Sequence, residues 1–145
     1  MAMVDVSNKA EVFREATATG SIKLKPETIT LVQAGKIAKG NPLYTAKIAG
    51  VLAAKRTSDL IPFCHPLPLT NVDVDVKVTD KTTISATATV KTKAQTGVEM
   101  EALTAVSLAL LTVWDMTKQY EKDAVGQYPS TSIENIHVVR KFKQA

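Results

Sequence analysis

Hydrophobic and polar residues alternate most regularly in the middle of the chain. Residues 72–78 carry valine at every second position with polar residues between, and residues 84–90 repeat the pattern with Ile, Ala, Ala and Val. Alternation with a period of two is typical of a strand with one buried face. Asp80 and Lys81 lie between the two stretches. The pattern therefore predicts an antiparallel hairpin.

Two helices are predicted before this hairpin. Pro26 is typical of a first helical position, and apolar residues follow it at helical spacing until Gly35. Asn41 and Pro42 form a second start, with Asn as the N-cap, and lead into a helix over residues 43–57.

A longer helix is predicted to run from Glu99 to about Glu121. Residues 96–99 read Thr-Gly-Val-Glu, which is a capping-box sequence. The apolar residues that recur at helical spacing are Leu103, Val106, Leu110, Val113 and Trp114.

A strand over residues 17–24, containing Gly20, and a last strand over residues 133–142 complete the pattern. The order β, α, α, β, β, α, β predicts an α+β fold of the ferredoxin-like βαββαβ type with an extra helix, its antiparallel sheet packed against helices. We expect residues 1–145 to form one domain, with residues 1–10 as a flexible arm.

Composition narrows the function classes. The chain has 145 residues, a net charge of +4, one cysteine and two histidines. A lone cysteine excludes an intrachain disulfide, so we predict a cytoplasmic protein, and we predict no metal site because so few metal ligands are present. No apolar stretch approaches the length of a membrane span, so no membrane partner is expected.

The connector over residues 59–69 is the first candidate site. It holds three prolines together with Cys64 and His65. A rigid apolar loop can aim an imidazole at a ligand. The structural alternative is a packed corner in which His65 bonds a carbonyl, and a Cys–His nucleophile pair is the weaker chemical idea.

Carboxylates on the long helix supply two further candidates. Glu99 and Glu101 lie at its start, although capping alone would explain Glu99. Asp115 and Lys118 are three residues apart and can act as a coupled acid and base, or form a plain surface ion pair. Fourteen residues span about 21 Å of helix, so Glu101 and Asp115 cannot contact the same reacting atom in one chain. If both are functional, a long ligand or a second subunit must connect them.

The net positive charge suits the binding of a polyanion, but the basic residues are scattered along the chain and do not form one continuous run. The basic residues between the elements are Arg14, Lys39, Lys47, Lys55, Arg56, Lys93 and Lys141. Neither of the common glycine-rich phosphate-loop patterns is present. An RNA-recognition module shares the βαββαβ plan, but the predicted hairpin contains no aromatic residue on which bases could stack. We therefore expect no nucleic-acid partner and keep a non-enzymatic nucleotide- or RNA-binding module as the alternative.

Four runs of residues resemble the molybdenum cofactor biosynthesis protein C family, the cyclic pyranopterin monophosphate synthases. They read AKRT from Ala54, DLIPFCHPL from Asp59, TGVEMEALTA from Thr96 and DMTK from Asp115. The four runs occur in the same order as in the family, and the resemblance covers roughly residues 3–123.

The resemblance implies a lyase that converts 3′,8-cyclo-7,8-dihydro-GTP into cyclic pyranopterin monophosphate and releases pyrophosphate. It also implies a homohexamer, a trimer of dimers, with the site at a subunit interface. No redox cofactor is required, and whether Mg²⁺ accompanies the triphosphate is left open.

The resemblance also implies roles for particular residues. Asp115 and Lys118 are the expected catalytic acid and base, with Lys118 as general acid. The carboxyl terminus departs from the family pattern because a Gly- and Lys-rich ending is missing, so Lys141 is taken as the lysine that relatives place in the site. The expected substrate-binding residues are Arg14, Lys39, Lys55, Phe63, Cys64, His65, Glu99, Met100, Glu101 and Lys141.

Overall fold

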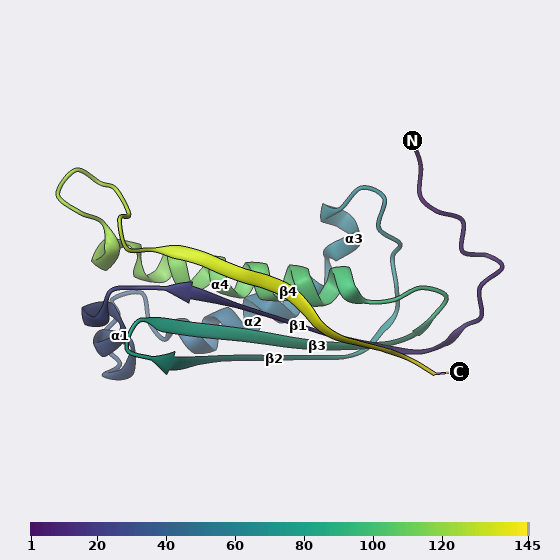
Figure 1. Cartoon of the computed structure of the whole chain (residues 1–145), viewed down its shortest axis with the longest axis horizontal. Helices are drawn as coiled ribbons and strands as arrows, with labels where there is room; N and C mark the ends of the chain where they lie inside the picture. Colours follow the sequence, from purple (N-terminus) through teal and green to yellow (C-terminus); the bar gives the residue numbers. More distant parts are fainter. Residues whose placement is uncertain (145) are drawn as a thin grey trace.

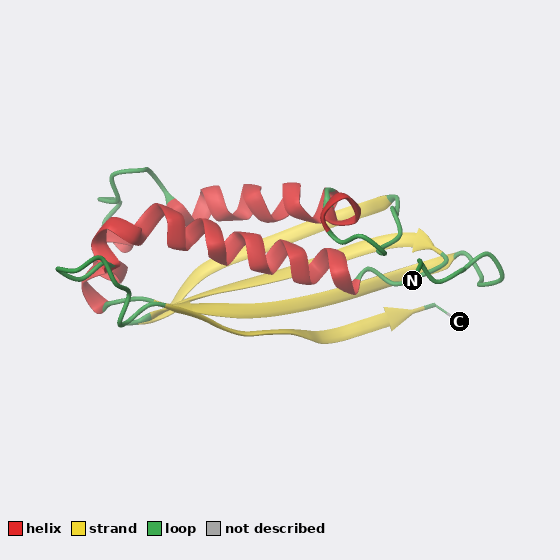
Figure 2. Cartoon of the chain, turned by 90° about the horizontal axis from the view of Figure 1, so that it is seen from above, coloured by secondary structure: helices red, strands yellow, loops and turns green. Residues whose placement is uncertain are grey.

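The structure, a computed structural model, describes residues 1–144 and contains a four-stranded antiparallel sheet with helices on one of its sides (Figures 1 and 2). The strand order is β2-β3-β1-β4. This order and the antiparallel pairing confirm the predicted ferredoxin-like α+β arrangement. The elements are β1 (Val12–Lys23), α1 (Pro26–Gln33), α2 (Pro42–Lys55), α3 (Thr57–Leu60), β2 (Leu69–Asp80), β3 (Thr83–Ala94), α4 (Glu99–Glu121) and β4 (Ser132–Lys143).

The core lies between the helices and the central strands. Alternate residues of β1 and β3 are buried on this side, and many of them are alanine. Gly20 shows how closely α4 approaches the sheet: a Cβ there would lie 2.8 Å from Ile136 Cγ1 and 3.1 Å from side chains of Val106 and Leu110. The absence of a side chain at this position therefore permits the close packing.

The other side of the sheet is polar at its centre. Thr17 and Thr89 hydroxyl oxygens lie 2.9 Å apart, and those of Thr19 and Thr87 lie 3.0 Å apart. No helix among residues 1–144 covers this side, as Figure 2 shows. Hydroxyl groups stand where a base-stacking sheet needs aromatic rings, so the RNA-binding alternative gains no support.

Several predicted boundaries needed correction. The first strand begins at Val12, five residues before the predicted start, and pairs along its length with β3. Helix α1 ends at Gln33 with Ala34 as its C-cap, so Gly35 lies next to the helix end as predicted. A short helix, α3, occupies residues 57–60, although the connector was expected to exclude regular helix. The turn fits there because it ends before Pro62, the first proline of the connector.

The predicted capping box at the start of α4 is wrong. The N-cap residue is Val98, and no side chain makes a capping hydrogen bond. The helix begins at Glu99, three residues after Thr96, so Thr96 stands too far from the first free N–H groups to cap them. The Glu99 carboxylate contacts Lys141 instead.

Helix α4 is long and apolar enough to span a membrane by length and composition alone, contrary to the expectation from the sequence. In this fold it packs against α2 and the sheet. Its buried side chains include Ala102, Ala105, Val106, Ala109, Leu110 and Val113. The helix is therefore the core helix of the domain.

Candidate active site

The predicted site residues form two groups near opposite ends of α4. Glu99 and Glu101 lie in the first turn of the helix, and Asp115 and Lys118 lie near its last turn. Figure 1 places the chain termini near the first of these ends and α1 at the other. Because 14 residues of helix span about 21 Å, one chain does not bring the two groups together.

Arg14, Glu99 and Lys141 line one cavity of about 260 Å³ at the amino-terminal end of α4. Lys141 Nζ lies 2.6 Å from Glu99 Oε1. Arg14 is buried, and its Nε donates to the Ala94 carbonyl oxygen at 3.0 Å. The cavity thus combines cations from β1 and β4 with two carboxylates, Glu99 of α4 and Glu15 of β1.

The charges of this cavity set the ionisation of Glu99. Burial by itself would raise the pKa of the Glu99 carboxyl, but the hydrogen bond from Lys141 and the nearby charge of Arg14 outweigh it and lower the pKa. Glu99 is therefore a carboxylate at neutral pH, and it neutralises part of the local positive charge.

Glu101 lies in a contrasting environment, because only 3% of the residue is exposed. Burial raises the pKa of its carboxyl, and the neighbouring charge of Glu99 acts in the same direction. Its Oε1 is buried and has no hydrogen-bond partner within residues 1–144. A buried polar atom without a hydrogen-bond partner is rare in folded proteins, because it decreases the stability of the fold. Glu101 can therefore accept a hydrogen bond from a ligand or from another chain.

Cys64 contacts Glu101 rather than an imidazole. Its Sγ lies 3.9 Å from Glu101 Oε2 and 3.8 Å from the His65 carbonyl oxygen. Burial and the charge of Glu101 both raise the pKa of the Cys64 thiol. A thiol that stays protonated is a poor nucleophile, so the geometry argues against a Cys–His nucleophile pair.

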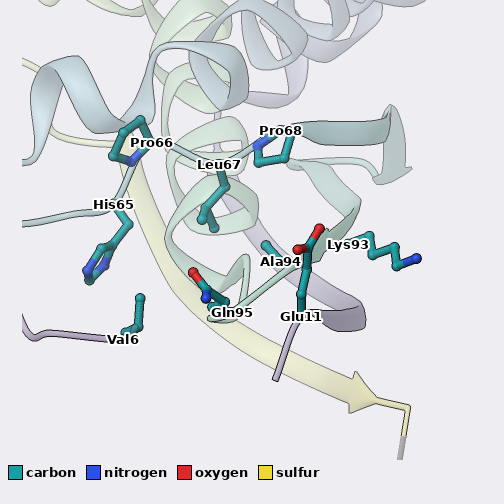
Figure 3. A pocket seen from close by; sticks show the side chains of 9 residues that line it. All are labelled: Val6, Glu11, His65, Pro66, Leu67, Pro68, Lys93, Ala94 and Gln95. Atoms are coloured by element: carbon teal, nitrogen blue, oxygen red, sulfur yellow. The ribbon is translucent and has the colours of Figure 1, made fainter. Parts of the chain in front are cut away.

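His65 borders a second pocket, formed by the connector, the amino-terminal arm and the end of β3. Figure 3 shows His65 and Val6 at one end of the pocket and Glu11 and Lys93 at the other. His65 Nε2 lies 2.7 Å from the Val4 carbonyl oxygen. Because a carbonyl only accepts, Nε2 carries the hydrogen. His65 does bond a carbonyl, but the carbonyl belongs to the arm and the ring still faces a pocket.

Three further predicted residues are exposed around this end. Phe63 and Met100 are 48% and 41% exposed, and Lys55 lies exposed in the last turn of α2. Lys55 forms no ion pair within residues 1–144. These side chains are thus free to contact a ligand or another chain.

The second group, at the other end of α4, is a carboxylate held between two ammonium groups. Lys39 Nζ lies 3.1 Å from Asp115 Oδ2, and Lys118 Nζ lies 3.1 Å from Asp115 Oδ1. The hydrogen bonds from Lys39 and then Lys118 lower the pKa of the Asp115 carboxyl. Asp115 therefore stays ionised at neutral pH and accepts hydrogen bonds from both lysines.

Comparison with known proteins decides the family. The model of the MoaC family matches residues 3–143. A probable cyclic pyranopterin monophosphate synthase of Methanococcoides burtonii is 57% identical over 98% of this chain and 89% of its own length. The chain belongs to the MoaC family.

Other MoaC-family relatives are equally similar. A probable cyclic pyranopterin monophosphate synthase of Thermococcus kodakarensis is 58% identical over 97% of this chain and 90% of its own length. A relative from Methanothermobacter thermautotrophicus, 56% identical over 97% of this chain and 88% of its own, is named a probable cyclic pyranopterin monophosphate synthase accessory protein.

The MoaC-family structure also places residues in the site that the sequence did not suggest. Lys9 and Lys143 line the cavity of Arg14 and Glu99. Lys143 could have been found, because it lies two positions after Lys141 and alternate residues of a strand share a face. Lys93 lines the pocket of His65, and it was noted only as one of the scattered cations.

Proposed function

We propose that this chain is a cyclic pyranopterin monophosphate synthase. In this role it converts 3′,8-cyclo-7,8-dihydro-GTP into cyclic pyranopterin monophosphate and pyrophosphate, as a lyase of molybdenum cofactor biosynthesis. The observation that carries the proposal is the Lys39–Asp115–Lys118 group, an ionised carboxylate between two proton donors, in a member of this family.

The two groups of residues suit the two halves of the reaction. Opening and rebuilding rings requires a proton donor, and we assign this role to Lys118, with Asp115 holding its ammonium in place. Departure of pyrophosphate requires positive charge near the phosphates. The cations at the amino-terminal end of α4, among them Arg14 and Lys141, supply it.

A complete site needs both groups, and we propose that two chains assemble it. One chain contributes the residues around Glu101, and its partner contributes Asp115 with its lysines. Exposed apolar residues at successive turns of α2, Tyr44, Ile48 and Leu52, offer a surface for self-association. The polar side of the sheet offers a second surface, as the proposed hexamer, a trimer of dimers, requires.

The proposed reaction needs no resident cofactor, and any Mg²⁺ would arrive with the triphosphate. Within residues 1–144, no three His, Cys, Asp or Glu side chains gather as a metal site would require. We propose a cytoplasmic location, where the nucleotide-derived substrate would be available.

Incubation of the purified chain with the cyclised GTP derivative tests the proposal. We expect stoichiometric pyrophosphate and cyclic pyranopterin monophosphate, and loss of both in Asp115→Asn and Lys118→Met variants that remain folded by circular dichroism. A folded wild-type chain that releases no pyrophosphate would overturn the proposal. That result would favour the accessory role named for one relative, in which the chain supports another enzyme.

A further inference from the structure

The loop between α1 and α2 carries Lys39 to the site. Gly35 and Gly40 have φ of +68° and +117°, a region that favours glycine. Ile37 is buried between them. Lys39 itself is exposed, and within residues 1–144 its ammonium donates to α4 at Asp115, to the backbone carbonyl oxygen and to the carboxylate. An exposed ion pair contributes little by itself. Ile37 and the hydrogen bond from the Gly40 N–H to its carbonyl oxygen hold the loop beside Ala38, and one further contact holds Ala38 itself.

That contact comes from Tyr120. The Ala38 backbone N–H donates to the Tyr120 hydroxyl oxygen at 2.8 Å. Ala38 directly precedes Lys39, and Tyr120 lies on α4 five residues after Asp115. The hydroxyl thus fixes the main chain one residue before the lysine whose ammonium must meet the carboxylate.

The helix end that bears Tyr120 is itself firmly held. The adjacent Glu121 is fully buried, and its carboxyl group accepts hydrogen bonds from the hydroxyls of Thr28 and Thr131. It also accepts the Lys25 backbone N–H at 3.0 Å. Hydrogen bonds therefore hold the last turn of α4 to the start of α1 and to the segment before β4, and Tyr120 lies on this fixed turn.

We propose that Tyr120 is a positioning residue of the synthase: its hydroxyl holds the Ala38 backbone so that the Lys39 ammonium meets Asp115. The proposal rests on the proposed function for its catalytic consequence. Its structural part, the fixing of the loop, stands on the contacts alone.

Tyr120→Phe tests the proposal because it keeps the ring and removes only the acceptor. Tyr128→Phe is the matched control, since its ring packs edge-on against Trp114 near the same helix end and its hydroxyl has no hydrogen-bond partner within residues 1–144. Loss of one neutral hydrogen bond predicts a decrease in kcat/KM for pyrophosphate release of about fivefold in Tyr120→Phe. Tyr128→Phe should match the wild type, and an unchanged kcat/KM in Tyr120→Phe would overturn the proposal.

A double-variant measurement separates positioning from general stability. In a Lys39→Met background, Tyr120→Phe should cause no further decrease, because the lysine it positions is gone. A fivefold decrease that persists without Lys39 would overturn the proposal.

Amide hydrogen exchange gives a readout independent of activity. In the unliganded chain, exchange at Ala38 should be at least about fivefold faster in Tyr120→Phe than in the wild type or Tyr128→Phe. Unchanged exchange at Ala38 would overturn the proposal. Absence of pyrophosphate from the wild type would overturn the proposed function instead, and exchange would still decide whether Tyr120 holds the loop.

Discussion

Lys141 Nζ lies 2.6 Å from Glu99 Oε1, which joins the last strand of the sheet to the first turn of α4. The two residues are far apart in the sequence, and the pair exists because β4 lies beside β1 at the sheet edge nearest this helix end. It places a cation in the cavity that Arg14 and Glu99 also line.

Replacing Lys141 with methionine should weaken phosphate binding and raise the pKa of Glu99. A hydrogen bond from Lys141 to a charged phosphate oxygen would contribute about 1.5–3 kcal/mol. We therefore expect its loss to decrease kcat/KM roughly tenfold to a hundredfold. If ionised Glu99 is required, the acid limb of the pH–rate profile should move to higher pH. Lys77→Met on β2 is the control, since that exposed lysine lies beside Asp75, away from both groups. An equal loss in both variants would contradict the assignment.

Glu101 should make stability depend on pH. Its pKa in the native state is raised above the ordinary value of 4.5, so the native state holds the proton more tightly than the unfolded state. The free energy of unfolding should therefore decrease as pH rises above about 4.5 toward the native pKa. Urea unfolding at about pH 5 and pH 8 measures this slope.

Glu101→Gln removes the titrating group and should flatten the slope. Because it also removes a buried charge, it should be more stable than the wild type at about pH 8, while turnover is lost. The same pH slope in both proteins would show that other groups control it.

Glu121→Ala should destabilise the fold strongly. It leaves the hydroxyls of Thr28 and Thr131 and the Lys25 N–H without their buried acceptor, which predicts a loss of about 3 kcal/mol in the free energy of unfolding. Glu121→Gln keeps an acceptor oxygen and should lose less. Glu27→Ala, an exposed position in α1, is the control for urea titration and should change stability by less than about 0.5 kcal/mol.

Ile48→Asp should reduce the size of the assembly. Tyr44, Ile48 and Leu52 are 64%, 46% and 51% exposed, and their spacing of four places them on one face of α2. A charge at the centre of this face opposes burial in an interface. Light scattering should report a smaller mass than for the wild type, whereas Val125→Asp, in an exposed loop, should keep the wild-type mass. Equal masses would exclude this face as an interface.

Local patterning was sufficient to predict the fold. The valine alternation of β2, the Asn41–Pro42 start of α2 and the apolar spacing of α4 each appear in the structure where the sequence placed them. Asn41 Oδ1 does accept from the backbone N–H groups of Leu43 and Tyr44. Such features depend on residues within a few positions of one another, so a single sequence reveals them.

The contacts that build the site depend on tertiary packing instead. Lys39 and Asp115 are 76 positions apart, and nothing in the sequence indicates that the loop after α1 folds back onto α4. The contact between Glu99 and Lys141 of β4 has the same origin, because it too joins residues far apart in the sequence. Motif resemblance named most of the residues, and helix length separated Glu101 from Asp115, but only packing shows which cations accompany each carboxylate.

The most direct test of a site shared between chains is complementation between two inactive variants. Glu101→Gln and Asp115→Asn should each release no pyrophosphate when expressed alone. Co-expressed in equal amounts with different affinity tags and purified as mixed assemblies, they should regain about a quarter of wild-type activity, because about one interface site in four then combines two intact groups. Mixed assemblies that form but remain inactive would contradict an active site built from the two ends of α4 on different chains.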